Sequence, residues 1–259
     1  MSGASDLFDL RGHVALITGG NGGIGLGMAD ALARQGAAVA IWGTNQSKND
    51  AAAEQLSVHG NPVLALRVDV GERAAVVAGI HDTVAALGRI DSCFVNAGVG
   101  GQAPSFVGMS DEEWHRVLRV NLDGAFFTAQ EAVKQMVAQQ PQGGSVVFTT
   151  SGSAKYGQQR GQHYGGSKGA LIAMMKGIAV EHARHGIRSN AILPGWVESE
   201  MTAPALGWDT FVEKVMPRIP MRRWGKPADF AGIAVYLASA ASSWHTGDVI
   251  TIDGGYHSF

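Results

Sequence analysis

The amino-acid sequence predicts an α/β fold: a doubly wound parallel sheet of about seven strands with helices on both faces. Short apolar runs alternate along the chain with longer amphipathic stretches, and this βαβα order is typical of a parallel sheet. The expected strands are continuous apolar runs, as in strands that are covered on both faces. Glycines cluster after such runs, at 19–23, 98–101 and 254–255, where a chain must turn sharply or approach a ligand closely.

Each element can be assigned from its apolar pattern and its flanking residues. The expected strands are 13–18, 37–42, 62–68, 91–95, 145–149, 187–193 and 248–252. The expected helices are 24–35, 47–58, 72–87, 111–139, 164–184 and 227–239. Ser110 is a suitable N-cap for the long helix. Pro227 stands in the first turn of the last helix, where proline is well tolerated.

The 259 residues show no repeat and no linker, so a single domain over 1–259 is expected, with an insertion at about 196–226. That insertion has no clear strand, but it is rich in large apolar side chains: Met201, Trp208, Phe211, Met216 and Trp224. A long apolar connection late in such a fold is often a lid over the site. A helical hairpin packed on the surface is the equally weighted alternative.

Composition excludes several classes of function. The net charge is −2, without the basic surplus of a nucleic-acid binder. No basic segment followed by an apolar run opens the chain, and no apolar stretch is long enough for a membrane span. The single cysteine, Cys93, cannot form an internal disulfide. The nine histidines lack a metal-ligand spacing. We therefore expect a cytoplasmic protein with a small-molecule substrate and no metal.

A glycine-rich segment, Thr18 to Gly25, follows the first strand and opens the first helix. Gly19, Gly23 and Gly25 leave no Cβ where a pyrophosphate must approach, and the helix N-terminus offers unpaired N–H groups to that anion. The strand–turn–helix context is what this motif requires. The segment therefore predicts dinucleotide binding rather than a plain glycine-rich turn.

The spacing G-x-x-x-G-x-G resembles that of the short-chain dehydrogenase/reductase family, in its single-domain branch with a Tyr-x-x-x-Lys motif. Further matching pieces follow in chain order: Asp69-Val70, Asn96-Ala97-Gly98, Asn121, Ser151, Tyr164 to Lys168, Pro194-Gly195 and Asp253-Gly254-Gly255. The resemblance covers essentially the whole chain. It implies a Rossmann-type fold, an NAD(P)-dependent oxidoreductase that interconverts a secondary alcohol and a ketone, and a homotetramer built through the long helices and the C-terminal strand.

The resemblance also implies a set of cofactor-binding residues. Asp69-Val70 would hold the adenine, and Asn96-Ala97-Gly98 would brace the sheet beside the cofactor. Val197 and Ser199 would meet the nicotinamide carboxamide. The full expected set is Gly19, Asn21, Gly23, Ile24, Gly25, Thr44, Asp69, Val70, Asn96, Ala97, Gly98, Tyr164, Lys168, Pro194, Gly195, Val197 and Ser199.

The chemistry of hydride transfer assigns the catalytic residues. A proton must follow the hydride, so the site needs an acid near the substrate oxygen and a polar donor beside it. Tyr164 and Lys168 are four residues apart and share one helix face, so the ammonium is expected to lower the pKa of the phenol. Tyr164 is the expected acid and base, and Ser151 the donor to the substrate oxygen. Family resemblance adds ribose binding by Lys168 and a water held by Asn121, although this asparagine could also be a solvated surface group.

The choice of nicotinamide is weakly encoded. An acidic residue at the end of the second strand favours NAD, and an arginine there favours NADP. Gly43 and Thr44 occupy these places, so neither signature is present. Because no acid repels a phosphate, which Thr44, Asn45 or Lys48 could bind, the sequence slightly favours NADP.

Some features leave alternatives open. Gly165 and Gly166 stand where the family often has alanine, either to admit a close neighbour or because they are tolerated. The polar segment 158–163 could contact a polar substrate or be a solvated loop, and the loop is favoured. Ser153, Gly98 to Gln102 and the 196–224 segment are expected to line the pocket. A non-redox enzyme on the same scaffold and a non-catalytic nucleotide-binding protein are the alternative functions.

Overall fold

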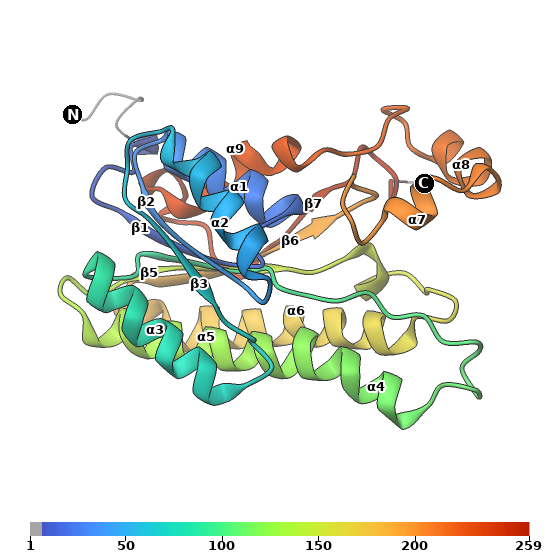
Figure 1. Ribbon diagram of the computed structural model, residues 1–259, viewed down its shortest axis with the longest axis horizontal. Coiled ribbons are helices and arrows are strands. Elements are labelled where there is room, and N and C mark those ends of the chain that lie inside the picture. Colours follow the sequence, from blue (N-terminus) through green and yellow to red (C-terminus); the bar gives the residue numbers. More distant parts are fainter. Residues whose placement is uncertain (1–6, 259) are drawn as a thin grey trace.

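A computed structural model describes residues 7–258 and contains one sheet of seven parallel strands in the order β3-β2-β1-β4-β5-β6-β7 (Figure 1). The strands are β1 (Val14–Thr18), β2 (Ala38–Gly43), β3 (Val63–Arg67), β4 (Ser92–Val95), β5 (Gly144–Thr149), β6 (Ile187–Pro194) and β7 (Val249–Ile252). Every hydrogen-bonded neighbour is parallel. The structure therefore confirms the predicted fold class, with every strand end within one residue of the expected one.

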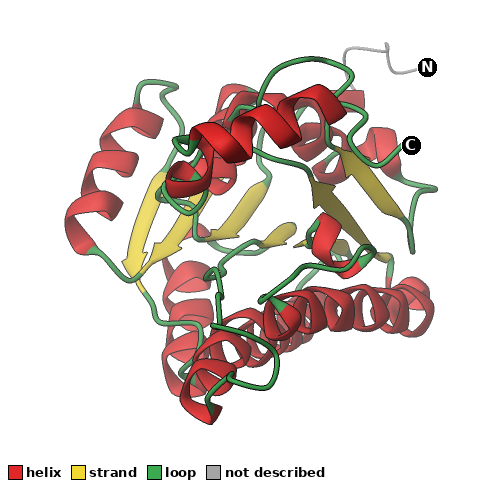
Figure 2. Ribbon diagram, turned by 90° about the vertical axis from the view of Figure 1, so that its right-hand side faces the viewer, coloured by secondary structure: helices red, strands yellow, loops and turns green. Residues whose placement is uncertain are grey.

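The α-helices of the described chain form two layers around the sheet (Figure 2), except α7 and α8, which lie beyond its edge (Figure 1). They are α1 (Gly23–Arg34), α2 (Gln46–Ser57), α3 (Arg73–Leu87), α4 (Asp111–Leu118), α5 (Gly124–Ala138), α6 (Gln162–His182), α7 (Ala203–Leu206), α8 (Asp209–Val215) and α9 (Ala231–Ala238). Ala15 and Ile17 of β1 pack with α1, α2 and α9, whereas Leu16 packs with α3, α5 and α6. Because successive strand residues face opposite layers, each strand must be apolar throughout.

The expected helix 111–139 is not continuous. A π-helical turn, Arg119–Asp123, separates α4 from α5 and contains Asn121. Such turns are rare and occur often at functional sites. The predicted N-cap is confirmed, since Ser110 Oγ accepts a 3.2 Å hydrogen bond from the Glu113 amide. The expected helix 227–239 begins as a 3₁₀ turn, Pro227–Phe230, before α9.

The insertion at 196–226 contains α7, α8 and a short 3₁₀ turn. Its two ends are held together, because Val197 pairs with Gly225 in a parallel bridge. Phe211 of α8 packs against Trp196, with ring centres 4.7 Å apart, and against Trp224 at 6.3 Å. Phe211 and Trp224 thus fold the segment onto itself, whereas Met201 and Trp208 are exposed.

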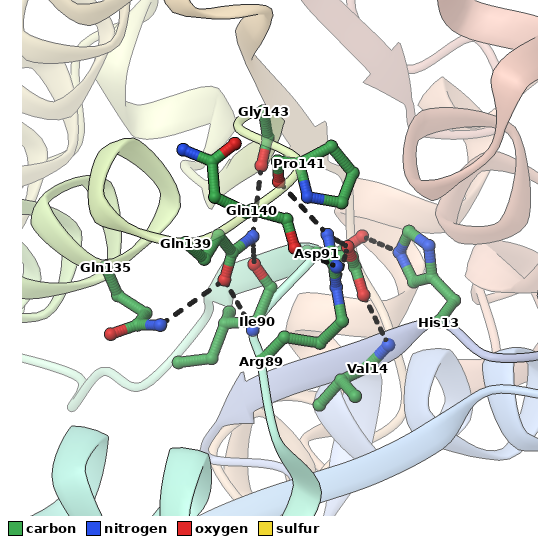
Figure 3. Close-up of polar contacts among 11 residues, drawn as sticks. His13, Val14, Arg89, Ile90, Asp91, Gln135, Gln139, Gln140, Pro141 and Gly143 are labelled. Carbon is green, nitrogen blue, oxygen red and sulfur yellow. Dashed lines mark hydrogen bonds and ion pairs between the residues drawn. The ribbon is translucent and has the colours of Figure 1, made fainter.

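A polar network fixes the amino edge of the sheet, opposite the site described below (Figure 3). The Gln139 amide donates to the carbonyl of Ile90 at 2.9 Å and accepts from its N–H at 3.1 Å. Asp91 pairs with Arg89 at 2.7 Å and accepts a hydrogen bond of 2.9 Å from the Val14 amide. These contacts join the end of α5 to the starts of β1 and β4, which keeps the two central strands in register.

Candidate active site

The carboxyl ends of the parallel strands meet at one edge of the sheet, and the expected site residues that follow strands lie there. The chain continues from β1 to β2 on one side, and β4 lies on the other side of β1. Ligands of open α/β sheets bind at such a switch point. The glycine-rich segment follows β1, and Asn96 follows β4, so both stand at this point.

The glycine-rich segment leaves room that side chains would fill. Gly19 has φ +64°, in the left-handed region that favours glycine. A Cβ on Gly25 would lie 2.2 Å from the Gly19 carbonyl oxygen. No side chain caps the N-terminus of α1, whose N-cap is Gly22. The first amides of this helix are therefore available to an anion, so the segment fits a dinucleotide pyrophosphate.

Asn96 and Thr18 connect β4 to the glycine-rich segment. The Asn96 amide donates to the carbonyls of Thr18 at 3.0 Å and of Gly19 at 3.3 Å. Thr18 Oγ1 accepts from the main-chain amides of Asn96 and Ala97, both at 3.0 Å. Thr18 was not singled out in the sequence, because a threonine at a strand end carries no distinctive signal.

The end of β2 is filled by two asparagines. Asn21 Nδ2 donates a 2.7 Å hydrogen bond to Asn49 Oδ1, and a Cβ on Gly43 would lie 2.1 Å from Asn21 Nδ2. Any larger residue at position 43 would therefore clash with the Asn21 side chain. Of the three suggested phosphate ligands, Thr44 is exposed, Asn45 caps α2, and Lys48 forms an ion pair with Glu200 of the insertion.

Asp69 and Val70 lie directly after β3 and are engaged with their neighbours. Asp69 pairs with Arg119 at 3.0 Å and accepts from the Gly71 amide at 2.9 Å. Val70 is buried against Gly124, at the start of α5. Because β3 is the outermost strand of the sheet, both residues stand at the outer part of the edge.

Lys168 of α6 is almost fully buried, with 4% of its surface exposed. Its Nζ donates a 2.9 Å hydrogen bond to the Thr149 carbonyl oxygen at the end of β5. A Cβ on Gly98 would lie 3.3 Å from Lys168 Nζ and 3.2 Å from Asn121 Oδ1, so these three residues meet at one place. Burial lowers the pKa of Lys168 to about 8, because a low-dielectric surrounding disfavours the charged form.

Tyr164 stands one turn before Lys168, with its ring centre 5.9 Å from Lys168 Nζ. Burial raises the pKa of Tyr164, and a hydrogen bond with Ser151 acts in the opposite direction. The expectation that the Lys168 ammonium lowers this pKa is therefore wrong for the protein alone. The side chain of Tyr164 is partly exposed by surface area. The surrounding protein nevertheless has a larger effect on its pKa than the nearby ammonium of Lys168. The phenol is held in its neutral form.

Asn121 is fully buried, so the interpretation as a solvated surface group is wrong. Its Oδ1 accepts from the Val99 amide at 2.7 Å and its Nδ2 donates to the Val99 carbonyl at 2.9 Å. Arg116 donates to the Gly100 carbonyl at 2.8 Å. His163, also fully buried, lies against Gly101. The segment after β4, which was expected to line the pocket, is thus fixed on several sides.

Ser151 lies two residues after the end of β5, at the start of a polar region. Its hydroxyl accepts from the Ser153 amide at 3.2 Å, and the Ser153 hydroxyl donates to Gln158. A cavity of about 430 Å³ adjoins this group, lined by Ser153, Gly157, Gln158, Gln159, Gly161, Gln162, Gly165 and Gly166. A Cβ on Gly165 would lie 2.8 Å from the Ser153 carbonyl, whereas Gly166 has open space. Gly165 therefore admits a close neighbour.

The chain after β6 approaches the glycine-rich segment. The amide of Gly195, next to Pro194, donates to the Ile252 carbonyl at 3.0 Å, which joins β6 to β7 at the site edge. Val197 is buried. A Cβ on Gly23 would lie 3.4 Å from Ser199 Cβ, so the insertion begins beside the glycine-rich segment.

The arrangement is therefore a neutral phenol, a serine hydroxyl and a buried amine beside a cradle suited to a pyrophosphate. Within residues 7–258, no group of three or more His, Cys, Asp or Glu side chains could hold a metal ion. No helix among the same residues has the length and apolar character needed to cross a membrane.

Known proteins match over nearly the whole chain. A family model described as enoyl-(acyl carrier protein) reductase matches residues 19–257. A gluconate 5-dehydrogenase from Gluconobacter oxydans (strain 621H) is 34% identical over 251 residues, which cover 96% of each protein. A short-chain type dehydrogenase/reductase from Mycobacterium marinum has a crystal structure with a TM-score of 0.92 at 38% identity, covering 97% of this chain and 98% of that one.

One further crystal structure is of a gluconate 5-dehydrogenase from Burkholderia cenocepacia J2315 in complex with NADP and tartrate. Its TM-score is 0.93 at 35% identity, and the match covers 99% of this chain and 100% of that one. These similarities extend over the glycine-rich segment, the Tyr164–Lys168 group and the insertion alike.

Proposed function

The chain belongs to the short-chain dehydrogenase/reductase family, and we propose that it acts with NADP on a polyhydroxylated ketone or the corresponding alcohol, of the sugar-acid class. As a member of this family it is an NAD(P)-dependent oxidoreductase that interconverts a secondary alcohol and a ketone. The observation that carries the proposal is the meeting of Tyr164, Ser151 and the buried Lys168 beside Gly98, at the edge where the glycine-rich segment lies.

The proposed catalytic roles follow from the contacts. When bound, the nicotinamide cofactor supplies or accepts the hydride. Tyr164 gives a proton to the substrate oxygen during reduction, because burial keeps its phenol neutral. Ser151, which is hydrogen-bonded to Tyr164, donates to the same substrate oxygen. Lys168 holds the nicotinamide ribose hydroxyls from its place beside Gly98.

Asn121 has a positioning role in this proposal. Its amide is occupied by the main chain of Val99, so it fixes the wall next to Lys168. A water held between Asn121 and Lys168 remains the role that the family resemblance implies. Both roles place Asn121 behind the reacting groups rather than against the substrate.

The remaining cofactor contacts are proposed as expected from the sequence. Pyrophosphate would rest on the segment after β1, adenine beside the end of β3, and the carboxamide against the start of the insertion. The proposed residues are Gly19, Asn21, Gly23, Ile24, Gly25, Thr44, Asp69, Val70, Asn96, Ala97, Gly98, Tyr164, Lys168, Pro194, Gly195, Val197 and Ser199.

The preference for NADP has four supports. No acidic side chain stands at the end of β2, where it would repel a 2′-phosphate. Asn21 fills the space over Gly43 that such a side chain would need. Lys48, at the start of α2, is the nearest cation in sequence to that strand end. The related gluconate 5-dehydrogenase from B. cenocepacia was crystallised with NADP.

The substrate class has its own support. The cavity beside Ser153 is lined by Gln158, Gln159 and Gln162, whose amides can pair with hydroxyl and carboxylate groups. The segment 158–163 is thus proposed as a substrate contact, in place of the solvated loop that the sequence favoured. Two relatives described above are gluconate 5-dehydrogenases.

Organisation and location are also proposals. One domain over 1–259 is supported by the single sheet, with 196–226 as the loop that covers the substrate. A homotetramer is supported by the outer edge of β7, which pairs with no further strand in the part of the chain that the structure describes. A cytoplasmic location is supported by the buried free thiol of Cys93, since reducing compartments keep thiols free.

The test begins with fluorescence titration of the protein with NADPH and with NADH. Oxidation of either cofactor is then followed with 5-ketogluconate, the product expected from oxidising carbon 5 of gluconate, and with cyclohexanone, which has no hydroxyl groups. Tighter binding of NADPH and faster reduction of the keto acid support the proposal. Turnover without net NADPH consumption would indicate a non-redox enzyme, and binding without any turnover a nucleotide-binding protein.

A further inference from the structure

The C-terminal turn after β7 is organised by Asp253. Its Oδ1 accepts a hydrogen bond from the Gly255 amide at 2.8 Å, and its Oδ2 accepts from the His257 amide at 2.9 Å. The same Oδ2 lies 2.8 Å from His257 Nδ1. The side chain of Asp253 is only 8% exposed. The Asp-Gly-Gly motif therefore forms a tight turn, and this turn fixes the orientation of the His257 ring.

Aromatic residues hold the same ring from two sides. Tyr156, in the loop after Ser151, stacks on His257 with ring centres 4.4 Å apart and an interplanar angle of 2°. The Tyr156 hydroxyl also donates to the His257 carbonyl at 3.1 Å. Tyr256 meets the ring edge-on, at 4.9 Å and 76°. A histidine fixed by a carboxylate, a stacked phenol and a second aromatic has little freedom to turn away.

The free edge of the imidazole faces the residue that follows the proposed catalytic serine. A Cβ on Gly152 would lie 2.2 Å from Cε1 and 2.5 Å from Nε2 of His257. Nδ1 is occupied by Asp253, and within residues 7–258 Nε2 has no hydrogen-bond partner. The side chain keeps 12% of its surface exposed. A polar atom is therefore held beside Ser151-Gly152 without a partner in the protein.

We propose that His257 is a specificity-determining residue whose Nε2 binds a hydroxyl or carboxylate oxygen on the substrate, next to the carbon whose oxygen meets Ser151. This inference rests on the proposed function, which places the reacting oxygen at Ser151 and gives the substrate oxygens on the neighbouring carbons. Because Asp253 takes the Nδ1–H, neutral His257 presents an acceptor to a substrate hydroxyl. Protonated His257 presents a donor to a carboxylate.

The alternative is a purely structural role, in which His257 only packs the C-terminal turn against Gly152. The two roles predict different effects when the imidazole is replaced by a ring without nitrogen. A phenyl ring at 257 keeps the stacking on Tyr156 but loses both Nε2 and the Nδ1 that pairs with Asp253, whereas a glutamine loses the stacking and keeps an amide that can reach a similar place. Packing is preserved better by phenylalanine, and hydrogen bonding is preserved better by glutamine.

The experiment measures kcat and KM for 5-ketogluconate and for cyclohexanone, with NADPH, in wild type, His257→Phe and His257→Gln. Loss of one hydrogen bond to the substrate corresponds to about a tenfold change. We expect His257→Phe to lower kcat/KM for the keto acid about tenfold, mainly through KM, and to leave cyclohexanone unchanged. His257→Gln should retain more of the keto-acid activity than the phenylalanine variant.

The matched control is His245→Phe. His245 also pairs with an aspartate, Asp248, at 3.1 Å and also contacts a tyrosine ring, Tyr236, at 5.7 Å. None of its contacts involves the segment 151–153. We expect this variant to treat both substrates as wild type does, with unchanged NADPH affinity by fluorescence.

The outcomes separate this inference from the function on which it rests. Equal loss with both substrates, or no loss with either, in His257→Phe overturns the substrate contact while the wild-type preference for the keto acid stands. A wild-type enzyme that reduces cyclohexanone but no polyhydroxylated ketone refutes the substrate class, and the His257 contact with it. If His257→Phe unfolds, as shown by its melting temperature, His257→Leu, which also lacks both ring nitrogens, takes its place in the same comparison.

Discussion

Lys168 is hydrogen-bonded to the end of β5 through both its side chain and its main chain. Its Nζ donates a 2.9 Å hydrogen bond to the Thr149 carbonyl oxygen, the last residue of that strand. Its own carbonyl oxygen accepts from the Thr150 hydroxyl, also at 2.9 Å. Among the ion pairs of the described chain, none gives this ammonium a carboxylate partner. A charged group is therefore buried with neutral neighbours, which is unfavourable for folding.

Removal of this charge should stabilise the free protein. We expect Lys168→Met to raise the free energy of unfolding at pH 7 by roughly 1–3 kcal/mol, because burial lowers the pKa of Lys168 from 10.5 to about 8. Between these pH values the unfolded chain binds the extra proton, so wild-type stability rises as the pH increases from 8 to 10.5. The variant should lack that rise and should have lost its turnover.

Urea unfolding at pH 7 and at pH 9.5 measures both effects. Lys176→Met is the matched control, because Lys176 is an exposed residue of the same helix, α6. It should unfold like wild type at both pH values. A Lys168→Met variant that is less stable than wild type at pH 7 would show that the hydrogen bond to Thr149 outweighs the cost of burial.

The neutral phenol of Tyr164 predicts opposite pH profiles for the two reaction directions. Burial raises the pKa of Tyr164, so the proton that reduction needs is present throughout the neutral range. Oxidation needs the deprotonated form, so its kcat should rise with pH up to that pKa. Tyr164→Phe should lower turnover by about 10²–10⁴-fold in both directions. NADPH binding by fluorescence should be retained, and a variant that turns over normally would contradict the proposed acid.

Most of the fold could be predicted from the sequence, because both faces of the sheet are covered. The alternation of residues such as Leu16 and Ile17 between two cores demands apolar side chains at every strand position. The break at Arg119–Asp123 could not be predicted, since no proline between 111 and 139 marks an interruption of the helix. The turn depends instead on Asn121, whose partner Val99 lies in another part of the chain.

The candidate site was predictable where it follows motifs and strand ends. What escaped the sequence depends on contacts between distant segments. The carbonyl of Thr149, which receives Lys168, belongs to the main chain and carries no sequence signal. Asn21 follows β1 and Gly43 ends β2, so their contact depends on how the two strands are placed in the fold. The pKa of Tyr164 was predicted in the wrong direction, because burial is a property of the folded surroundings and not of residue spacing.

Asn121 should be needed for stability as well as for turnover. Asn121→Ala leaves the N–H and the carbonyl of Val99 without their partners. Since the site is fully buried, we expect a loss of roughly 1–3 kcal/mol in the free energy of unfolding. Hydrogen exchange of the Val99 amide should become faster in the variant. Unchanged exchange at Val99 would show that other contacts suffice to hold this segment.

The ion pair between Lys48 and Glu200 should compete with the 2′-phosphate of NADP. Lys48 starts α2 next to the end of β2, and Glu200 belongs to the insertion. Both side chains are largely exposed, at 46% and 82%, so the pair contributes at most about 1 kcal/mol. Glu200→Gln should free Lys48 and tighten NADPH binding by roughly fivefold or less, since a tenfold change corresponds to 1.4 kcal/mol. NADH, which lacks the phosphate, should bind as before.

Lys48→Met should have the reverse effect, weakening NADPH and leaving NADH unchanged. Fluorescence titration of both cofactors measures the ratio of their dissociation constants, which cancels any general change in the site. Glu198→Gln is the matched control, because Glu198 is an exposed acid two residues away whose charge acts on Arg223. Equal shifts for NADPH and NADH in Glu200→Gln would mean that the ion pair orders the insertion instead of competing with a phosphate.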